Sequence, residues 1–165
     1  MSQAFRGNRN YSTRITLARV SASGRVLGID VGGRRVGLAI SDPSCTLARP
    51  LLTLTVEGPA DAVARVANEI ARLAREEDGL ATIVVGAPAR LDGTPNAQTA
   101  AVDAFVAALR ARTNLPIVRE DERLTSREAE SRLAVNERDW RRRKARLDAA
   151  AAAIILQDYL DRDGS

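Results

Sequence analysis

The sequence predicts an α/β fold, with a mixed five-stranded sheet that carries helices on both faces. Three observations lead to this prediction. The first part of the chain has three short apolar runs separated by turn residues, as sequential strands do. Helical apolar spacing then alternates with short apolar runs, the pattern of helices that cover buried strands. The 165 residues are 45% hydrophobic and only 3% aromatic, which suits one domain with an aliphatic core.

The three apolar runs, at residues 26–30, 36–40 and 51–56, are predicted to be the first three strands. Gly32 and Gly33 predict a tight hairpin turn between the first two. Because sequential strands joined by short connections usually pair, we expect an antiparallel meander with the first strand near the centre of the sheet.

The chain then alternates between helices and strands. A helix is expected over residues 59–77, and the apolar run 81–86 has the length of a buried parallel strand. A second helix, which contains Val102 and Phe105, ends near Arg112, and residues 116–119 are the last predicted strand.

Two further helices are expected near the carboxyl end. Ser126 is a good N-cap for a helix that runs to about Ala134. Residues 136–146 are basic and lack apolar periodicity, so we expect them to be irregular, and the alanine-rich segment 147–160 is a strong helix former.

Positive charge is concentrated in two places. The net charge is +4, and residues 1–25 carry five arginines and no acid; removing these five from the 25 basic residues leaves 20, against 21 acids. We therefore expect a disordered basic arm at residues 1–24 and a folded domain at residues 25–162. Clustered arginines suit a polyanion such as nucleic acid, although a solvated charged face is the alternative. The second basic cluster consists of Arg138, Arg141, Arg142, Arg143, Lys144 and Arg146.

The absence of histidine excludes several classes of site. Ser-His-Asp and Cys-His catalysis and histidine-bound zinc are not available to a chain with no histidine and one cysteine, Cys45. A bound metal must then have oxygen ligands, which favour Mg²⁺ or Mn²⁺. A lone cysteine and the lack of an apolar run of about 20 residues predict a cytoplasmic protein without a membrane span.

Three acidic residues have surroundings that suggest chemistry. Asp30 lies within the first apolar run, where an unpaired charge is costly to bury. Glu122 follows the last predicted strand, and Asp148 begins the last predicted helix. If they meet at one edge of the sheet, two divalent ions about 4 Å apart would offset their charge and could activate water for attack on a phosphate.

Each acid also has a purely structural interpretation, which the sequence leaves open. Asp30 could cap the glycine turn or pair with Arg34 or Arg35. Glu122 could pair with a neighbouring arginine, and Asp148 could simply interact with a helix dipole.

Four short motifs occur in a distinctive order along the chain. They are Gly28-Ile29-Asp30-Val31-Gly32 with Arg35-Val36-Gly37-Leu38-Ala39, Val85-Gly86-Ala87-Pro88 with Asp92-Gly93, Asp121-Glu122-Arg123-Leu124-Thr125, and Asp148-Ala149-Ala150-Ala151-Ala152. In this order they resemble the YqgF/RuvX family over nearly all of residues 25–160. The resemblance implies a ribonuclease H-like fold related to the RuvC resolvases. It also implies a nuclease that processes precursor 16S rRNA or resolves Holliday junctions.

Carried over by motif, the resemblance implies that Asp30, Glu122 and Asp148 are catalytic and bind Mg²⁺ or Mn²⁺, with Asp121 as an alternative ligand to Glu122. Ala87 departs from the leucine of many relatives, and the basic arm lies outside the resemblance. The expected partners are structured RNA or branched DNA, ribosomal precursor particles and, for a junction resolvase, a second copy of the chain. The residues expected to bind nucleic acid are Arg34, Arg35, Arg123, Arg141, Arg142, Arg143, Lys144 and Arg146.

The predicted function is a metal-dependent nuclease that processes the 5′ end of precursor 16S rRNA in ribosome biogenesis. The alternatives are a Holliday junction resolvase and a non-catalytic nucleic-acid-binding factor. An actin-like ATPase or sugar kinase ranks last: Asp30-Val31-Gly32-Gly33 resembles its phosphate loop, but such enzymes close two domains around a nucleotide and 165 residues supply one.

Overall fold

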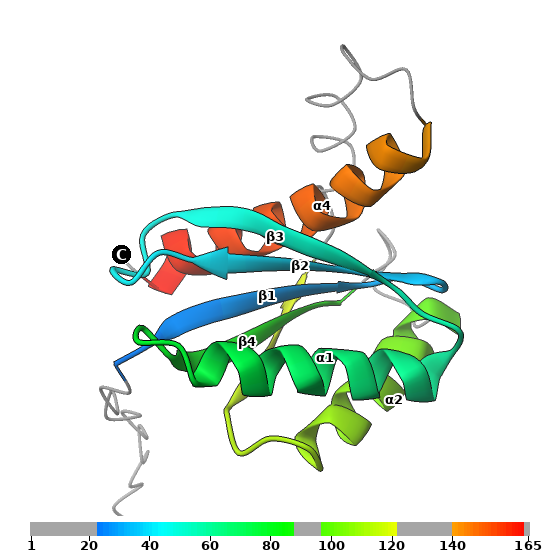
Figure 1. The fold of residues 1–165 in the computed structure, drawn as a ribbon, viewed down its shortest axis with the longest axis horizontal. Helices are drawn as coiled ribbons and strands as arrows, with labels where there is room; N and C mark the ends of the chain where they lie inside the picture. The colour runs from blue at the N-terminus through cyan, green and yellow to red at the C-terminus, as the bar shows by residue number, and fades with distance from the viewer. Residues whose placement is uncertain (1–22, 88–96, 122–139, 164–165) are drawn as a thin grey trace, which may run out of the picture.

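A computed structural model describes residues 23–87, 97–121 and 140–163. In this part of the chain, five strands and three helices follow the predicted order (Figure 1). The strands are β1 (Arg25–Val31), β2 (Arg35–Ser41), β3 (Ala48–Thr55), β4 (Leu80–Ala87) and β5 (Ile117–Asp121), and the helices are α1 (Pro59–Ala74), α2 (Ala97–Arg110) and α4 (Trp140–Asp163).

The strands form one mixed sheet in the order β3-β2-β1-β4-β5. β1, β2 and β3 are an antiparallel meander, while β4 runs parallel to β1 and β5 runs parallel to β4. The predicted meander, the parallel strand and the central position of β1 are thus confirmed. This is the ribonuclease H-like arrangement that the family resemblance implies. It brings the carboxyl ends of β1, β4 and β5 to the same edge of the sheet.

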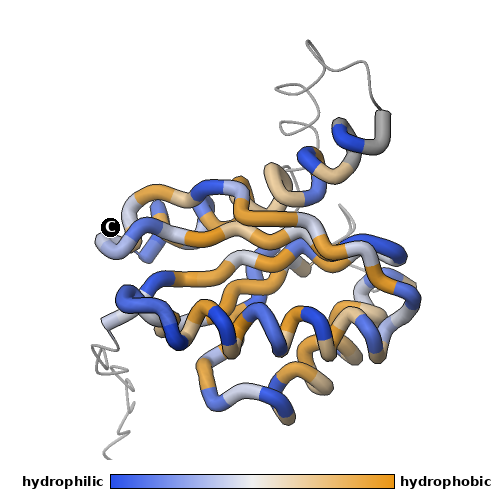
Figure 2. The backbone as a smooth tube through the Cα atoms, viewed as in Figure 1, coloured by the Kyte–Doolittle hydropathy of each residue, from blue (hydrophilic) through white to orange (hydrophobic). Residues whose placement is uncertain are grey.

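Helices cover both faces of the sheet, as predicted. α1 and α2 lie on one face and α4 lies on the other (Figure 1). Strand alternation divides the core accordingly: Leu27 and Ile29 of β1 pack on the side of α1 and α2, while Val26 packs with Ile155 and Leu156 of α4. Hydrophobic segments line these interior surfaces, and α1 alternates between apolar and polar positions along its length (Figure 2).

The last helix is longer than expected, and the prediction of an irregular segment is wrong from Trp140 onward. α4 begins at Trp140 rather than at residue 147. Arginine, lysine and alanine are good helix formers, and no glycine or proline interrupts residues 140–147, so propensity is sufficient without an apolar stripe. The predicted arm up to residue 22, the helix 126–134 and residues 136–139 lie outside the described residues.

The third strand also begins earlier than expected, at Ala48 rather than at residue 51, and it includes Pro50. β3 is an edge strand, and its pairing with β2 is shifted between Leu38 and Ala39, where Pro50 lies opposite Ala39. Proline lacks an N–H, and an edge or a bulge tolerates that loss.

None of the helices in the described ranges is both long enough and apolar enough to be a membrane-spanning segment.

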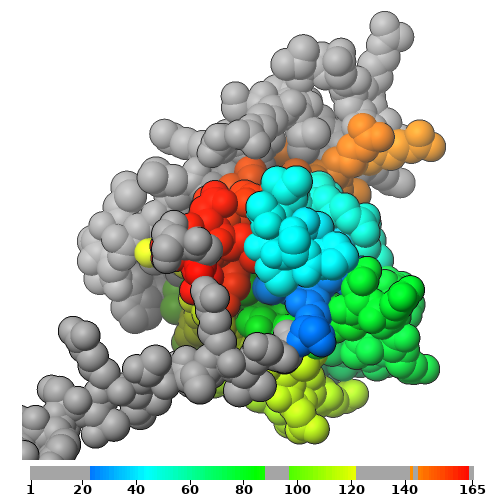
Figure 3. Space-filling model, turned by 90° about the vertical axis from the view of Figure 1, so that its left-hand side faces the viewer, coloured from blue at the N-terminus to red at the C-terminus, as the bar shows by residue number. Residues whose placement is uncertain are grey.

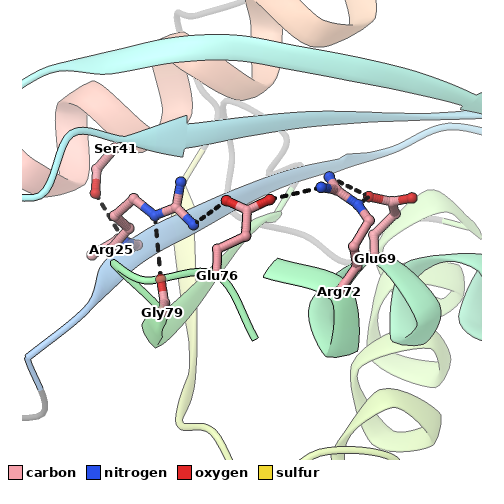
Figure 4. A network of polar contacts seen from close by, with 7 residues as sticks. Arg25, Ser41, Glu69, Arg72, Glu76 and Gly79 are labelled. Carbon is pink, nitrogen blue, oxygen red and sulfur yellow. Dashed lines mark hydrogen bonds and ion pairs between the residues drawn. The ribbon is translucent and has the colours of Figure 1, made fainter. Parts of the chain in front are cut away.

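A polar network connects the start of β1 to the end of α1 (Figure 4). The buried Arg25 guanidinium donates to Glu76 Oε2 at 2.7 Å and to the Gly79 carbonyl at 3.3 Å. Glu76 also accepts from Arg72, which binds Glu69. The network lies at the end of β1 opposite to Asp30 and therefore stabilises the fold away from the candidate site.

This network predicts a loss of stability in acid. The hydrogen bond from Arg25, assisted by its charge and that of Arg72, holds the pKa of Glu76 below its ordinary value. The stabilisation is complete above the pKa of an unfolded glutamate, about 4.3, and is lost as the pH falls through the lower pKa of the folded state. Urea unfolding between pH 7 and pH 3 should show a smaller acid-induced decrease in stability for Glu76→Gln than for the wild type. An equal decrease in both proteins would contradict this assignment.

Candidate active site

Glycine allows the backbone of α4 to lie directly on β2. A Cβ atom at Gly37 would be 2.0 Å from the carbonyl oxygen of Asp148, closer than any real contact. On β1, a Cβ atom at Gly28 would be 2.8 Å from the Cβ of Leu156 and 3.0 Å from the carbonyl oxygen of Ala152. These two positions without side chains therefore allow α4 to approach the sheet closely, and the contact at Gly37 sets where Asp148 lies.

Asp30 is directly opposite Gly37 in the antiparallel pair of β1 and β2. Side chains at directly opposed positions project from the same face of a sheet. Because the Cβ direction of Gly37 leads to α4, Asp30 also faces α4, and it is half-buried there. The structure thus brings the strand position of Asp30 and the helix position of Asp148 together at one end of the sheet.

Arg35 binds Asp148 directly. Its Nε donates to Asp148 Oδ2 at 2.7 Å, and the two side chains are 26% and 28% exposed. Asp148 is the ninth residue of α4 rather than its first, so it lies beyond the turn in which a helix dipole acts. The helix-dipole interpretation of Asp148 is therefore wrong. Arg35 is one of the two arginines that the sequence suggested as partners of Asp30, and its Nε donates to Asp148.

A further acid at this end of the sheet was not singled out from the sequence. Ile29 pairs with Val85, and Gly86 pairs with Glu120, so Asp30, Gly86 and Glu120 are next to one another across three parallel strands. Glu120 is only 5% exposed and forms an ion pair with Arg162 of α4. Strand alternation is the signal that could have indicated its face. The preceding residue, Arg119, forms an ion pair with Asp103 of α2, so Glu120 projects from the opposite face, toward α4.

The third predicted ligand is not described. Glu122 and Arg123 lie outside the described residues, whereas Asp121 is exposed at the end of β5. Within residues 23–87, 97–121 and 140–163, no three acidic or cysteine side chains are grouped closely enough to hold a metal ion. The described site therefore comprises Asp30 and Asp148, with Glu120 on the same face of the sheet two strands away from Asp30.

Several predicted basic residues surround this end of the molecule. Arg34 is exposed in the turn between β1 and β2, and Arg142 and Arg146 are exposed one helical turn apart on α4. Arg141, Arg143 and Lys144 belong to α4, but their side chains are outside the described part of the protein. The beginning of α4 projects past the sheet in both views (Figures 1 and 3).

A hollow of about 420 Å³ lies between β3 and α4, and its lining includes Ala149, the residue that follows Asp148. Its lining is mainly apolar, with Thr53 and Arg146 as polar members. Thr53 lies opposite Gly37 in the sheet, and its hydroxyl donates to the Ala145 carbonyl. This hydrogen bond is a further contact that holds α4 above the edge of the sheet.

The donor atoms at this site suit a hard divalent cation. The chain has no histidine, and the described acids at this end of the sheet offer carboxylate oxygens only. Oxygen ligands are those that Mg²⁺ and Mn²⁺ prefer. The close approach of Asp148 to the strand pair that carries Asp30 makes it possible for both carboxylates to serve one cation site.

Comparisons with known proteins place this geometry in context. A family model described as "RuvX: Holliday junction resolvase" matches residues 24–162. A protein of Chloroflexus aggregans named "Putative pre-16S rRNA nuclease" is 43% identical over 136 residues, which cover 82% of this chain and 92% of that protein. A protein of Salinibacter ruber with the same name is 40% identical over 151 residues, which cover 90% of this chain and all of that protein.

Among solved structures, RuvC of Thermus thermophilus in complex with a Holliday junction substrate is similar to this chain. The TM-score is 0.48 at 18% identity, and the match covers 86% of this chain and 96% of RuvC.

Proposed function

Because the chain belongs to the RuvX family, we propose that it is a metal-dependent nuclease that hydrolyses phosphodiester bonds at the 5′ end of precursor 16S rRNA. The names of its relatives support this substrate. One structural observation carries the proposal: the backbone of Asp148 lies against Gly37, the direct partner of Asp30. Two acids 118 positions apart are thereby brought to the same end and face of the sheet.

Asp30 and Asp148, together with Glu122 or Asp121, are the proposed ligands of Mg²⁺ or Mn²⁺. Two such ions, when bound, would activate the attacking water and stabilise the leaving oxygen. Oxygen-only ligands and a chain without histidine support this choice of metal. The proposal keeps Glu122 on the basis of the family motif, in which it directly follows β5 and the Asp121 that ends it.

The remaining residues of the site are proposed to bind and orient the nucleic acid. Arg34 on the hairpin and Arg142 and Arg146 on α4 are exposed around the two acids, where guanidinium groups can bind phosphate oxygens. Their positive charge would also offset the repulsion between the backbone phosphates and the carboxylates. The basic residues at 1–24 and Arg123, Arg141, Arg143 and Lys144 are proposed to extend this surface.

A second candidate substrate is a four-way DNA junction, because the matching family model is described as a Holliday junction resolvase. Resolution requires two cuts, so this function needs two active sites and hence a dimer. Processing of an rRNA end needs one active site. Both activities would use the same acids and the same metal, and both substrates are found in the cytoplasm of bacteria, which is the location we propose.

A side-by-side cleavage assay distinguishes the two substrates. Equal amounts of a 16S precursor 5′ fragment and a four-way DNA junction are incubated with the protein and Mg²⁺ or Mn²⁺, and products are resolved by electrophoresis. The proposal predicts metal-dependent cleavage of the RNA at a discrete position, which EDTA abolishes. Cleavage of the junction alone would establish the second candidate. Binding of either substrate without cleavage in any metal would establish a non-catalytic binding factor instead.

A further inference from the structure

The two neighbouring arginines of the β1–β2 hairpin differ in their contacts. Arg34 is exposed in the turn, and the hydrogen bond described for it uses its backbone carbonyl, which accepts from the Val56 N–H. Arg35 is the first residue of β2, is only 26% exposed and directs Nε to Asp148 Oδ2 at 2.7 Å. A phosphate-binding role suits the first arginine, whereas the second already has a carboxylate partner inside the site.

We propose that Arg35 is a positioning residue for Asp148 and does not itself bind nucleic acid, an inference that rests on the nuclease function proposed above. Gly37 determines where the backbone of Asp148 lies, but the carboxylate can still rotate about two side-chain bonds. The hydrogen bond from Arg35 fixes that rotation. It engages Oδ2 and would leave Oδ1 to serve as the cation ligand.

The strand and the helix both restrain this pair. Arg35 is held in the β2 ladder opposite Thr55, and Gly37, two residues later, contacts the backbone of Asp148 itself. The partners are 113 positions apart in sequence, so the contact forms only when α4 docks on the sheet. Replacing a residue that hydrogen-bonds a metal-binding carboxylate commonly weakens metal affinity by about 10–100-fold.

A phosphate-binding role for Arg35 makes different predictions from a positioning role. Replacing an arginine that neutralises a phosphate weakens the salt dependence of nucleic-acid binding: the slope of log affinity against log salt concentration decreases by about one unit. An arginine that orients Asp148 leaves this slope unchanged and weakens metal binding instead. A purely competitive role, in which the guanidinium takes the place of the cation at Asp148, predicts tighter metal binding after its removal.

The test uses Arg35→Lys and Arg35→Gln, with Arg34→Gln as the matched comparison. Lysine keeps the positive charge but lacks the planar guanidinium that places Nε on Oδ2, so it separates geometry from charge. Binding of Mn²⁺ is measured without nucleic acid, from the free Mn²⁺ signal in electron paramagnetic resonance. Binding of the RNA fragment is measured in EDTA at several salt concentrations, and thermal unfolding verifies that each variant is folded.

We expect both Arg35 variants to bind Mn²⁺ about tenfold more weakly or worse, to have a lower kcat, and to keep the wild-type salt slope for RNA. Arg34→Gln should bind Mn²⁺ normally and lose about one unit of slope. Unchanged or tighter Mn²⁺ binding by Arg35→Lys, or a reduced salt slope for Arg35→Gln, overturns the inference and leaves the nuclease proposal intact. A wild-type protein that neither binds Mn²⁺ nor cleaves nucleic acid contradicts the proposed function itself, and the inference with it.

Discussion

Replacing Asp30 with asparagine is expected to abolish metal-dependent cleavage while nucleic-acid binding persists. Asparagine has nearly the same shape, so the packing of β1 against α4 is preserved, but it removes the charge that a divalent ion requires. A decrease in kcat of at least about 10³-fold is expected, which corresponds to about 4 kcal/mol of transition-state stabilisation. Single-turnover cleavage and electrophoretic mobility shifts in EDTA measure the two properties separately.

The control for this variant is Asp78→Asn, the same substitution at an exposed position in the turn before β4. It lies at the opposite end of the parallel strands from Asp30 and should cleave at the wild-type rate. Cleavage by Asp30→Asn at a rate similar to that of this control would remove Asp30 from the catalytic set.

Replacing Gly37 with alanine is expected to destabilise the protein strongly, although it adds only one methyl group. The added Cβ would be 2.0 Å from the carbonyl oxygen, 2.3 Å from the carbonyl carbon of Asp148 and 2.9 Å from the Ala149 nitrogen. All three atoms belong to the helix backbone and cannot rotate away, so α4 must shift. Overpacking of this kind costs about 3 kcal/mol, or about 10 °C in Tm for a domain of this size.

Gly33→Ala is the matched control, because a Cβ at Gly33 would have no atom within 4 Å. Its effect on stability should be within about 0.5 kcal/mol. Thermal and urea unfolding of both variants test the comparison, and Mn²⁺ binding tests whether displacement of α4 also disturbs Asp148. Equal stability of Gly37→Ala and Gly33→Ala would show that α4 does not rest on Gly37 as described.

The elements of the fold were predictable because their signals are local. Strand-length apolar runs separated by turn residues indicated β1, β2 and β4, and helical spacing indicated α1 and α2. The start of α4 was not predictable in this way, because its first residues are basic and carry no apolar stripe. Their helical structure follows from propensity and from continuity with the alanine-rich part that packs on the sheet.

The candidate site was predictable only in part. Asp30 is conspicuous in sequence because a carboxylate interrupts an apolar run. Glu120 is less conspicuous: strand alternation could have indicated its face, but its burial at this end of the sheet follows from the pairing of β5 with β4 and the ion pair with Arg162. Arg35 could be assigned to phosphate as readily as to a carboxylate until the position of Asp148 was known.

The sequence by itself determined the chemical character of this protein: an aliphatic α/β domain with basic clusters, no histidine, and the ordered motifs of one family. Only the tertiary structure decided which of its charged groups meet. The physical reason is that the contact depends on the absence of a side chain at Gly37. That absence lets the backbone of α4 reach β2 and places Asp148 against Gly37, which is paired with Asp30 across the two strands. It also gives Arg35 a carboxylate to bind.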